Sequence, residues 1–224
     1  MQLVQATRDA LLRPLTTVSG IVERRHTLPI LANILLRKQG DEVAFVASDI
    51  EVQITTHAAF GVGEETAATT VAARKLLDIL RALPDANDVK IELADGRLTV
   101  RSGKSRFALQ TLDAQDFPAV ELPAQWDVSF SMPQKALKHL FNMVHFAMAQ
   151  QDIRYYLNGL LFVIEPGSVR TVATDGHRLA HCGVNADGID SNHDVIIPRK
   201  TVLEMQRLLA DSDDPVQMDV AHGR

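Results

Sequence analysis

The chain has 224 residues, of which 46% are apolar and 23% are charged, so it can form one large or two modest globular domains and is unlike disordered, fibrous or membrane-spanning chains. The single cysteine, Cys182, excludes an internal disulfide framework and a zinc site built from several cysteines. The net charge of -5 by itself argues against a nucleic-acid partner, because Lys and Arg bind phosphates.

The amino-terminal segment predicts a strand followed by a helix. A strand over 1–5 leads to Thr7, whose side chain can cap a helix. Leu11, Leu15 and Val18 then recur at helical spacing. Charged residues stand where a signal peptide needs an apolar stretch, and no run approaches the roughly 18 to 20 apolar residues of a membrane span. We therefore expect a cytoplasmic protein.

The rest of the first half predicts two groups of strands and one more helix. Turn residues such as Gln39-Gly40-Asp41 and Asp95-Gly96 separate the strands, and Pro84 ends the helix. The expected elements are strands over 30–38, 42–48, 52–60, 69–71, 89–93, 97–102 and 106–112 and a helix over 74–83. The order strand, helix, three strands therefore occurs twice.

The second half repeats the first at an offset of 125 to 126 residues. Ala47-Ser48-Asp49 matches Ala173-Thr174-Asp175, for example. The expected elements are helices over 133–145 and 199–209 and strands over 157–165, 168–174, 179–184 and 216–220. Two homologous domains are therefore expected, over 1–120 and 127–224, joined near Pro118 and Pro123.

Each half is thus predicted as two βαβββ modules, and the fold class as α+β, with helices on one face of antiparallel sheets. By the register of the repeat, the last two strands of the second domain would follow Arg224. A sheet without its closing strands leaves an edge unpaired. We therefore expect this chain to be a shortened form of a longer protein.

The repeat changes the interpretation of the net charge. The helix regions 7–25, 74–83, 133–145 and 199–209 hold twelve basic and four acidic residues, whereas the rest holds eleven basic and twenty-four acidic residues. Positive helices packed on negative sheets would attract phosphate on one side only. Ordinary solvated helix faces explain the same count, so this alternative stays open.

Segments that differ between the two copies are candidates for function. Asp49 and Asp175 match, so Asp175 is expected to stabilise a turn through its side chain. Gly176-His177-Arg178 and Arg154-Tyr155-Tyr156 have no counterpart of the same residue types in the first copy. Ordinary turn and core roles remain the alternative for both segments.

Three patterns that suggest enzymes or metal sites fail on spacing or context. Gly103-Lys104-Ser105 lacks the earlier glycine and the following helix of a phosphate-binding loop. His177, His181 and Cys182 lie on an expected strand, where four residues span about 13 Å, too far for one ion. Asp175 and His177 lack a nucleophile in the right context. No catalytic residue, metal or cofactor is expected.

The chain resembles the bacterial DNA polymerase III beta subunit family, the replicative sliding clamps, over its whole length. Four segments carry the resemblance: Thr27-Leu-Pro-Ile-Leu31, Ser102-Gly-Lys-Ser-Arg-Phe107, Arg154-Tyr-Tyr-Leu-Asn-Gly159 and Val172-Ala-Thr-Asp-Gly-His-Arg-Leu-Ala180. The resemblance implies the DNA-clamp fold and a homodimeric ring of three-domain subunits, whose helices surround duplex DNA. It also implies a processivity factor without catalysis that tethers polymerases and the clamp loader. The third domain is absent from this sequence.

The resemblance also implies three groups of site residues. The expected DNA contacts are Arg25, Arg74, Gln151, Tyr155, Tyr156 and Lys200. The expected half of a pocket for partner peptides is Arg154, Leu157, Thr174, His177, Arg178 and Leu179. The expected dimer interface is Lys75, Ile79, Leu83, Arg106, Phe107 and Leu109. Gln150 departs from the family, where a His is expected, which could weaken one DNA contact.

Two rival hypotheses remain. An enzyme that uses Asp175 and His177 would lose turnover in His177→Ala, whereas a clamp would lose peptide binding. A protein adapter that never meets DNA would tolerate charge reversal at Arg25 and Arg74, whereas a clamp would lose salt-sensitive DNA retention.

Overall fold

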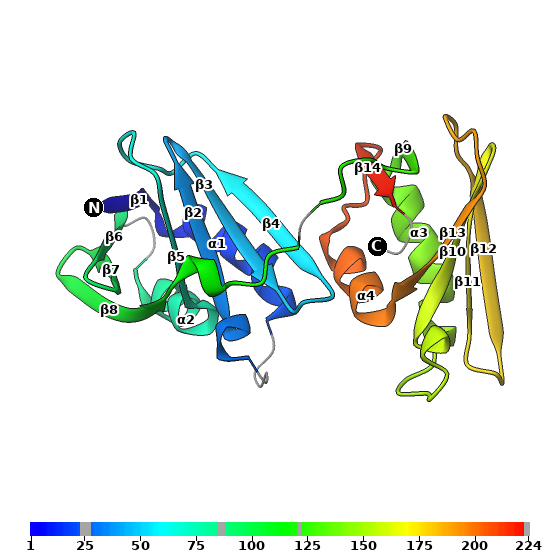
Figure 1. Ribbon diagram of the computed structural model, residues 1–224, viewed down its shortest axis with the longest axis horizontal. Coiled ribbons are helices and arrows are strands. Elements are labelled where there is room, and N and C mark those ends of the chain that lie inside the picture. Colours follow the sequence, from blue (N-terminus) through cyan, green and yellow to red (C-terminus); the bar gives the residue numbers. More distant parts are fainter. Residues whose placement is uncertain (23–27, 85–87, 121, 222–224) are drawn as a thin grey trace. The chain divides into compact units, whose positions relative to one another are not determined.

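The computed structural model describes residues 1–22, 28–84, 88–120 and 122–221. It divides the chain into two compact units, unit 1 (1–121) and unit 2 (122–224). In each unit the helices pack on one side of antiparallel strands (Figure 1), which confirms the α+β class.

Unit 1 consists of two βαβββ modules that share one eight-stranded sheet. The first module contains β1 (Gln2–Thr7), α1 (Arg8–Val18), β2 (Asn33–Gln39), β3 (Glu42–Ser48) and β4 (Gln53–Ala58). The second contains β5 (Ala67–Ala72), α2 (Ala73–Ala82), β6 (Asp88–Ala94), β7 (Arg97–Ser102) and β8 (Ser105–Leu112). In the sheet order β1-β6-β7-β8-β5-β2-β3-β4, the first strand of each module pairs with the other module. The modules therefore build a single core.

The helix faces follow from the apolar spacing. Thr7 caps α1, because its hydroxyl oxygen accepts a hydrogen bond from the backbone N–H of Ala10 at 3.3 Å. Leu11 and Leu15 of α1 and Leu76 of α2 are fully buried in the core. Burying one such leucine contributes about 1.5 to 3 kcal/mol. The opposite sides of both helices are exposed to solvent and carry the charged residues.

Unit 2 repeats most of this arrangement. Its elements are β9 (Val128–Pro133), α3 (Gln134–Val144), β10 (Gly159–Glu165), β11 (Ser168–Thr174), β12 (Leu179–Asn185), β13 (His193–Pro198), α4 (Arg199–Leu208) and β14 (Pro215–Val220). The strands form one sheet in the order β12-β11-β10-β13 and a pair β14-β9. These orders match β4-β3-β2-β5 and β6-β1 of unit 1.

The structure differs from the expected elements most clearly at the starts of two strands. The segments Pro29–Ala32 and Tyr155–Asn158 form 3-10 helices, and the strands begin only at Asn33 and Gly159. The expected strands over 30–38 and 157–165 were therefore wrong at their starts. Proline at the first helical position favours this turn in unit 1. No bounds were predicted for the strands that form β9 and β13.

A short apolar cluster lies on the other side of the unit 1 sheet. Phe117, which follows β8, packs with Ile30, Leu31, Leu35 and Val46. The backbone N–H of Val120 also donates to Oε1 of Gln53 at 2.9 Å. The segment after β8 is therefore held on the face of the sheet opposite the helices.

Candidate nucleic-acid and partner interfaces

The exposed side of the unit 1 helices carries basic side chains. Arg13 of α1 and Arg74, Lys75 and Arg81 of α2 are all exposed. Within the residues that the structure describes, none of these four side chains forms a hydrogen bond or an ion pair. The predicted DNA contact Arg74 therefore lies among cationic groups that are available to a ligand. Arg25, the other predicted contact in this unit, lies outside the described residues.

Arg8 connects the two helices. Its NH1 group donates to the backbone carbonyl of Leu83 at 3.0 Å, and its Nε lies 3.5 Å from Oδ1 of Asp9. The start of α1 therefore lies beside the end of α2. Because α1 and α2 also contact each other directly, their exposed residues belong to one surface.

In unit 2 a loop before β10 carries most of the predicted contacts, and Asp152 organises it. Its carboxylate accepts hydrogen bonds from the backbone N–H of Arg154 at 2.8 Å, from Arg154 Nε at 3.0 Å and from Arg154 NH2 at 2.9 Å. Asn158 closes the loop, because its side-chain amide bonds both the N–H and the C=O of Asp152, at 2.9 and 2.8 Å. The hydrogen bond from the Arg154 side chain is the main reason that the pKa of Asp152 falls from 3.8 to about 2.

The same loop presents aromatic and polar side chains to solvent. Tyr155 and Tyr156 are 81% and 49% exposed, and their rings meet edge to face with centroids 5.8 Å apart. Gln151 is exposed and adopts a left-handed backbone conformation, with φ of 58°. Lys200, at the start of α4, is half-buried and has an interaction partner. Gln151 and both tyrosines thus lie within one loop, and Lys200 lies on a separate element.

The hairpin between β11 and β12 is built on the carboxylate of Asp175. Its Oδ1 accepts hydrogen bonds from the backbone N–H groups of His177 and Arg178, at 2.9 and 3.0 Å. The bond from His177 is the first cause, and that from Arg178 the second, of a lowered pKa of Asp175. The structural role predicted for Asp175 is therefore confirmed. Gly176 adopts φ of +86° in this turn.

Arg154 and the hairpin lie against each other. A Cβ atom at Gly176 would lie 3.3 Å from NH2 of Arg154, so the guanidinium packs on the glycine backbone. The hairpin also holds Thr174, whose hydroxyl donates to the carbonyl of Arg178 at 2.8 Å. His177 is exposed, and Leu179, at the start of β12, is 63% exposed. The structure therefore brings Arg154 to the hairpin that carries four other predicted pocket residues.

Leu157 is the remaining predicted pocket residue. It is half-buried in the 3-10 helix before β10, and its backbone N–H donates to the carbonyl of Arg154 at 2.9 Å. Leu157 therefore lies in the same loop as Arg154.

Three residues that support Arg154 or the β11–β12 hairpin were not predicted from the sequence. Phe146 is 51% exposed, and the guanidinium carbon of Arg178 lies 5.7 Å from its ring centroid, within range of a cation–π interaction. Asp152 and Asn158 hold Arg154 in place. Asn158 lies within the segment 154–159 that carries the family resemblance, and Asp152 lies two residues before Arg154, whereas nothing local points to Phe146.

His177, His181 and Cys182, which were rejected from the sequence as metal ligands because of their spacing, do not converge. On β12, His181 is exposed and Cys182 faces the core, as alternate strand residues do. Among the residues that the structure describes, no three His, Cys, Asp or Glu side chains are placed to hold an ion. The structure thus offers no support for the zinc alternative.

The predicted dimer interface of unit 1 centres on an open strand edge. β8 pairs with β7 along its length but with β5 only through Leu112 and Thr111. Residues 105–110 have no strand partner on that side in the described part of the chain. Phe107 is 37% exposed on this edge, whereas Leu109 is buried. Of the α2 residues, Lys75 is exposed, Ile79 is half-buried and Leu83 is buried.

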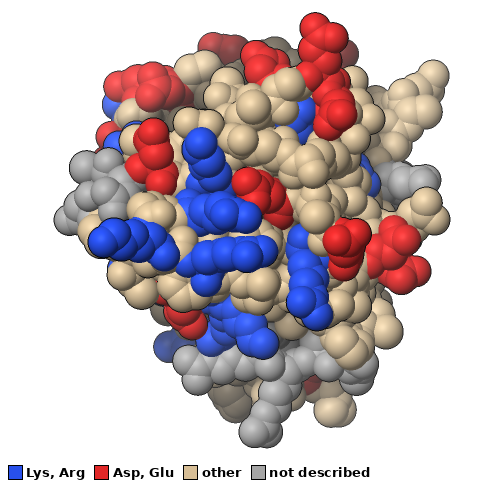
Figure 2. All heavy atoms as spheres, turned by 90° about the vertical axis from the view of Figure 1, so that its left-hand side faces the viewer, with Lys and Arg blue, Asp and Glu red and all other residues tan. Residues whose placement is uncertain are grey.

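Cations gather on the outer face of the neighbouring strands. Lys90 of β6 lies opposite Arg101 of β7, which lies opposite Arg106 of β8. Figure 2, which looks onto this end of unit 1, shows Lys and Arg side chains close together. Like charges directly opposite each other on a sheet are unfavourable. Only Arg101 has a carboxylate partner among these three, Glu92 at 2.9 Å, within the described residues.

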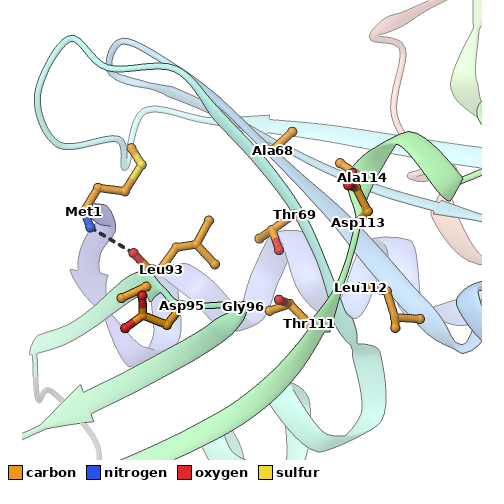
Figure 3. A pocket seen from close by; sticks show the side chains of 11 residues that line it. Met1, Ala68, Thr69, Leu93, Asp95, Gly96, Thr111, Leu112, Asp113 and Ala114 are labelled. Carbon is orange, nitrogen blue, oxygen red and sulfur yellow. Dashed lines mark hydrogen bonds between the residues drawn. The ribbon is translucent and has the colours of Figure 1, made fainter.

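A cavity of about 490 Å³ lies elsewhere in unit 1, near the amino terminus. Its wall includes Thr69, Asp95, Thr111 and Asp113, and the amino group of Met1 donates to the carbonyl of Leu93 beside it at 2.8 Å (Figure 3). None of the predicted site residues lines it. Its lining therefore adds nothing to the three surfaces described above.

None of the helices within the described ranges is long and apolar enough to cross a membrane. Two family models match the chain: the N-terminal domain of the DNA polymerase III beta subunit over residues 1–121 and its central domain over 131–224.

Individual relatives agree with the family models. The chain is 45% identical over 210 residues to a beta sliding clamp of Pseudomonas aeruginosa, covering 93% of this chain and 57% of the relative. It is 44% identical over 213 residues to a beta sliding clamp of Escherichia coli, covering 95% of this chain and 58% of the relative. A crystal structure of the DNA polymerase III subunit beta from Pseudomonas aeruginosa superposes with a TM-score of 0.93 at 43% identity, over 98% of this chain and 60% of that one. The chain thus spans less than two thirds of the length of these relatives.

Proposed function

The chain belongs to the DNA polymerase III beta subunit family, and we propose that it forms part of a sliding clamp. In this role it encircles duplex DNA without reading its sequence, in a homodimeric ring, and tethers polymerases and the clamp loader. The clamp acts as a processivity factor in the cytoplasm and carries out no reaction of its own.

The surface of α1 and α2 is the main support for contact with DNA. The side chains of Arg13, Arg74 and Arg81 are exposed and have no partner in the described part of unit 1. Such groups can bind phosphates, and phosphate contacts carry no sequence information. These groups would attract any duplex, which suits a protein that must slide.

We assign further DNA contacts to Gln151, Tyr155, Tyr156 and Lys200 in unit 2 and to Arg25 in unit 1. The exposure of the two tyrosines and of Gln151 on one loop supports this assignment. Tyrosine hydroxyls and amides can hydrogen-bond phosphate oxygens without carrying charge.

We assign the binding of partner peptides to the region around the β11–β12 hairpin. The contact of Arg154 with Gly176 and the exposure of Leu179 support it, because together they offer cationic and apolar groups side by side. The residues assigned to this half of a pocket are Arg154, Leu157, Thr174, His177, Arg178 and Leu179.

We assign the open edge of β8 to contact with another subunit. Unpaired backbone groups can accept an additional strand, and the row of cations beside the edge suits an acidic partner face. The residues assigned to this interface are Lys75, Ile79, Leu83, Arg106, Phe107 and Leu109.

Charge reversal on α2 tests the contact with DNA. We expect Arg74→Glu to weaken binding to a labelled duplex roughly three- to tenfold at 50 mM salt, because one phosphate contact is lost and a repulsion is added. Fluorescence anisotropy measures the affinity, and circular dichroism checks that the fold is kept.

Arg37→Glu is the matched control for this experiment. Arg37 is an exposed arginine of the same unit, on β2, two residues after Leu35, whose side chain packs in the cluster on the face opposite the helices. It therefore lies on the opposite face, and its reversal should change affinity far less. Equal losses in both variants would favour a nonspecific charge effect, and no loss in Arg74→Glu would favour the protein adapter.

A further inference from the structure

The basic residues of the unit 2 helices differ from those of unit 1 in their surroundings. Nζ of Lys135 on α3 lies 2.7 Å from a carboxylate oxygen of Asp213. NH2 of Arg207 on α4 lies 2.8 Å from a carboxylate oxygen of Glu204. Both cations are thus neutralised by a neighbour from their own unit.

The other basic residues of α3 and α4 are also engaged. Nζ of Lys138 donates to the carbonyl of Leu209 at 2.9 Å, and NH1 of Arg199 donates to the carbonyl of His145 at 3.3 Å. Lys200 has a partner too. All three side chains are half-buried. In unit 1, by contrast, Arg8 is engaged in this way, but the side chains of Arg13, Arg74 and Arg81 are exposed and unpaired within the described residues.

We expect this difference to separate the salt response of Lys135 and Arg207, which have carboxylate partners, from that of the unpaired cations of unit 1. A cation that binds a DNA phosphate releases a condensed counterion, which makes affinity fall as salt rises. A cation that is already paired with a carboxylate must leave that carboxylate to bind a phosphate. The carboxylate then takes up a counterion from solution, so the net number of counterions released on binding is small. Uncharged contacts from Tyr155, Tyr156 and Gln151 release none.

We propose that the two units divide the work of holding DNA: the helices of unit 1 supply the salt-dependent attraction, and unit 2 supplies salt-independent contacts through its tyrosine loop. This inference rests on the proposed function, since it requires that both units meet the duplex. It assigns long-range attraction to α1 and α2, and short-range positioning to the loop over 151–156.

Two double variants with equal charge change test this division. Arg74→Gln with Arg81→Gln removes two exposed, unpaired cations, and Lys135→Gln with Arg207→Gln removes two exposed, paired ones. The affinity for a labelled duplex is measured by anisotropy between about 50 and 200 mM salt. Log affinity falls linearly with log salt, and we expect the unit 1 double to make this negative slope shallower by about two, because each phosphate contact contributes about 0.9 to its magnitude.

The unit 2 double should change this slope by less than half as much. Tyr155→Ala should weaken binding by the same factor at both salt concentrations. Equal slope changes in the two doubles, or a larger change in the unit 2 double, would overturn the division. Failure of the unaltered protein to bind duplex at low salt would instead overturn the proposed contact with DNA, and the division with it.

Discussion

Asp152 shows how one carboxylate can organise a surface made of residues with other roles. It binds the backbone and the guanidinium of Arg154, which in turn packs on Gly176. Hydrogen bonds between charged groups are stronger than neutral ones. Because Tyr155 and Tyr156 directly follow Arg154 in the chain, the Asp152 carboxylate fixes the backbone that carries all three side chains, although we assign the tyrosines and Arg154 to different partners.

The loop should loosen when this carboxylate is neutralised. In Asp152→Asn we expect backbone amides over 154–158 to exchange with solvent roughly tenfold faster, because the charged bonds to Arg154 are lost. Hydrogen exchange followed by mass spectrometry measures this. Asp219→Asn, an exposed carboxylate on β14, is the control. Unchanged exchange in Asp152→Asn would mean that Asn158 alone holds the loop.

The same pKa shift predicts how the loop responds to pH. Because the pKa of Asp152 is lowered to about 2 in the folded protein, its stabilising effect is complete above the ordinary value of 3.8. It is lost only as pH falls through about 2. Protection of the loop, corrected for intrinsic exchange rates, should therefore stay constant between pH 5 and 8.

At the level of elements, the two units use the same hairpin with different residues at its tip. Oδ1 of Asp49 accepts from the N–H of Val52 at 2.6 Å, as Oδ1 of Asp175 does from Arg178 at 3.0 Å. The left-handed position is Gly176 in unit 2 but Ile50 in unit 1, with φ of 81°. A β-branched residue is strained in this conformation.

Replacing this isoleucine should therefore stabilise unit 1. Ile50 is 53% exposed, so Ile50→Gly loses little packing and relieves the strain. We expect a gain of about 0.5 to 1 kcal/mol in the free energy of unfolding, after the greater flexibility of unfolded glycine is deducted. Denaturant titration measures it. Gly176→Ala, the converse change, should destabilise the protein, and a loss in Ile50→Gly would contradict the argument.

At the level of the whole molecule, each unit has its own hydrophobic core. The core of unit 1 includes Leu76 of α2, and that of unit 2 includes Leu140 of α3, and no residue belongs to both cores. Both leucines are fully buried. Each repeat thus buries its helices against its own strands.

Separate cores predict separate losses of stability. Leu76→Ala should destabilise unit 1 by about 2 to 5 kcal/mol through the cavity it leaves. Hydrogen exchange resolved along the chain should show lost protection in β6 and β7 and unchanged protection in β10 and β11. Leu140→Ala is the matched variant with the reverse pattern. A joint loss in both units would show that they unfold together.

Much of this fold follows from local patterns in the sequence. The helices expected over 74–83 and 199–209 are α2 and α4 to within one residue at each end. The repeat and its turn residues predicted the βαβββ order, which the structure confirms in unit 1. The starts of β2 and β10 were wrong, because an apolar run does not distinguish a strand from a short 3-10 helix that precedes it.

The sequence by itself determined the repeat, the helices and their excess of basic residues, because these depend on residue type and spacing along the chain. Only the tertiary structure decided which of those cations are free. Arg74 stays exposed, whereas Lys135 meets Asp213, which is 78 residues away in the chain. The position of Arg154 on Gly176 and that of Phe146 under Arg178 were decided in the same way. Electrostatic pairing and packing depend on distances in space, which the order of residues alone does not contain.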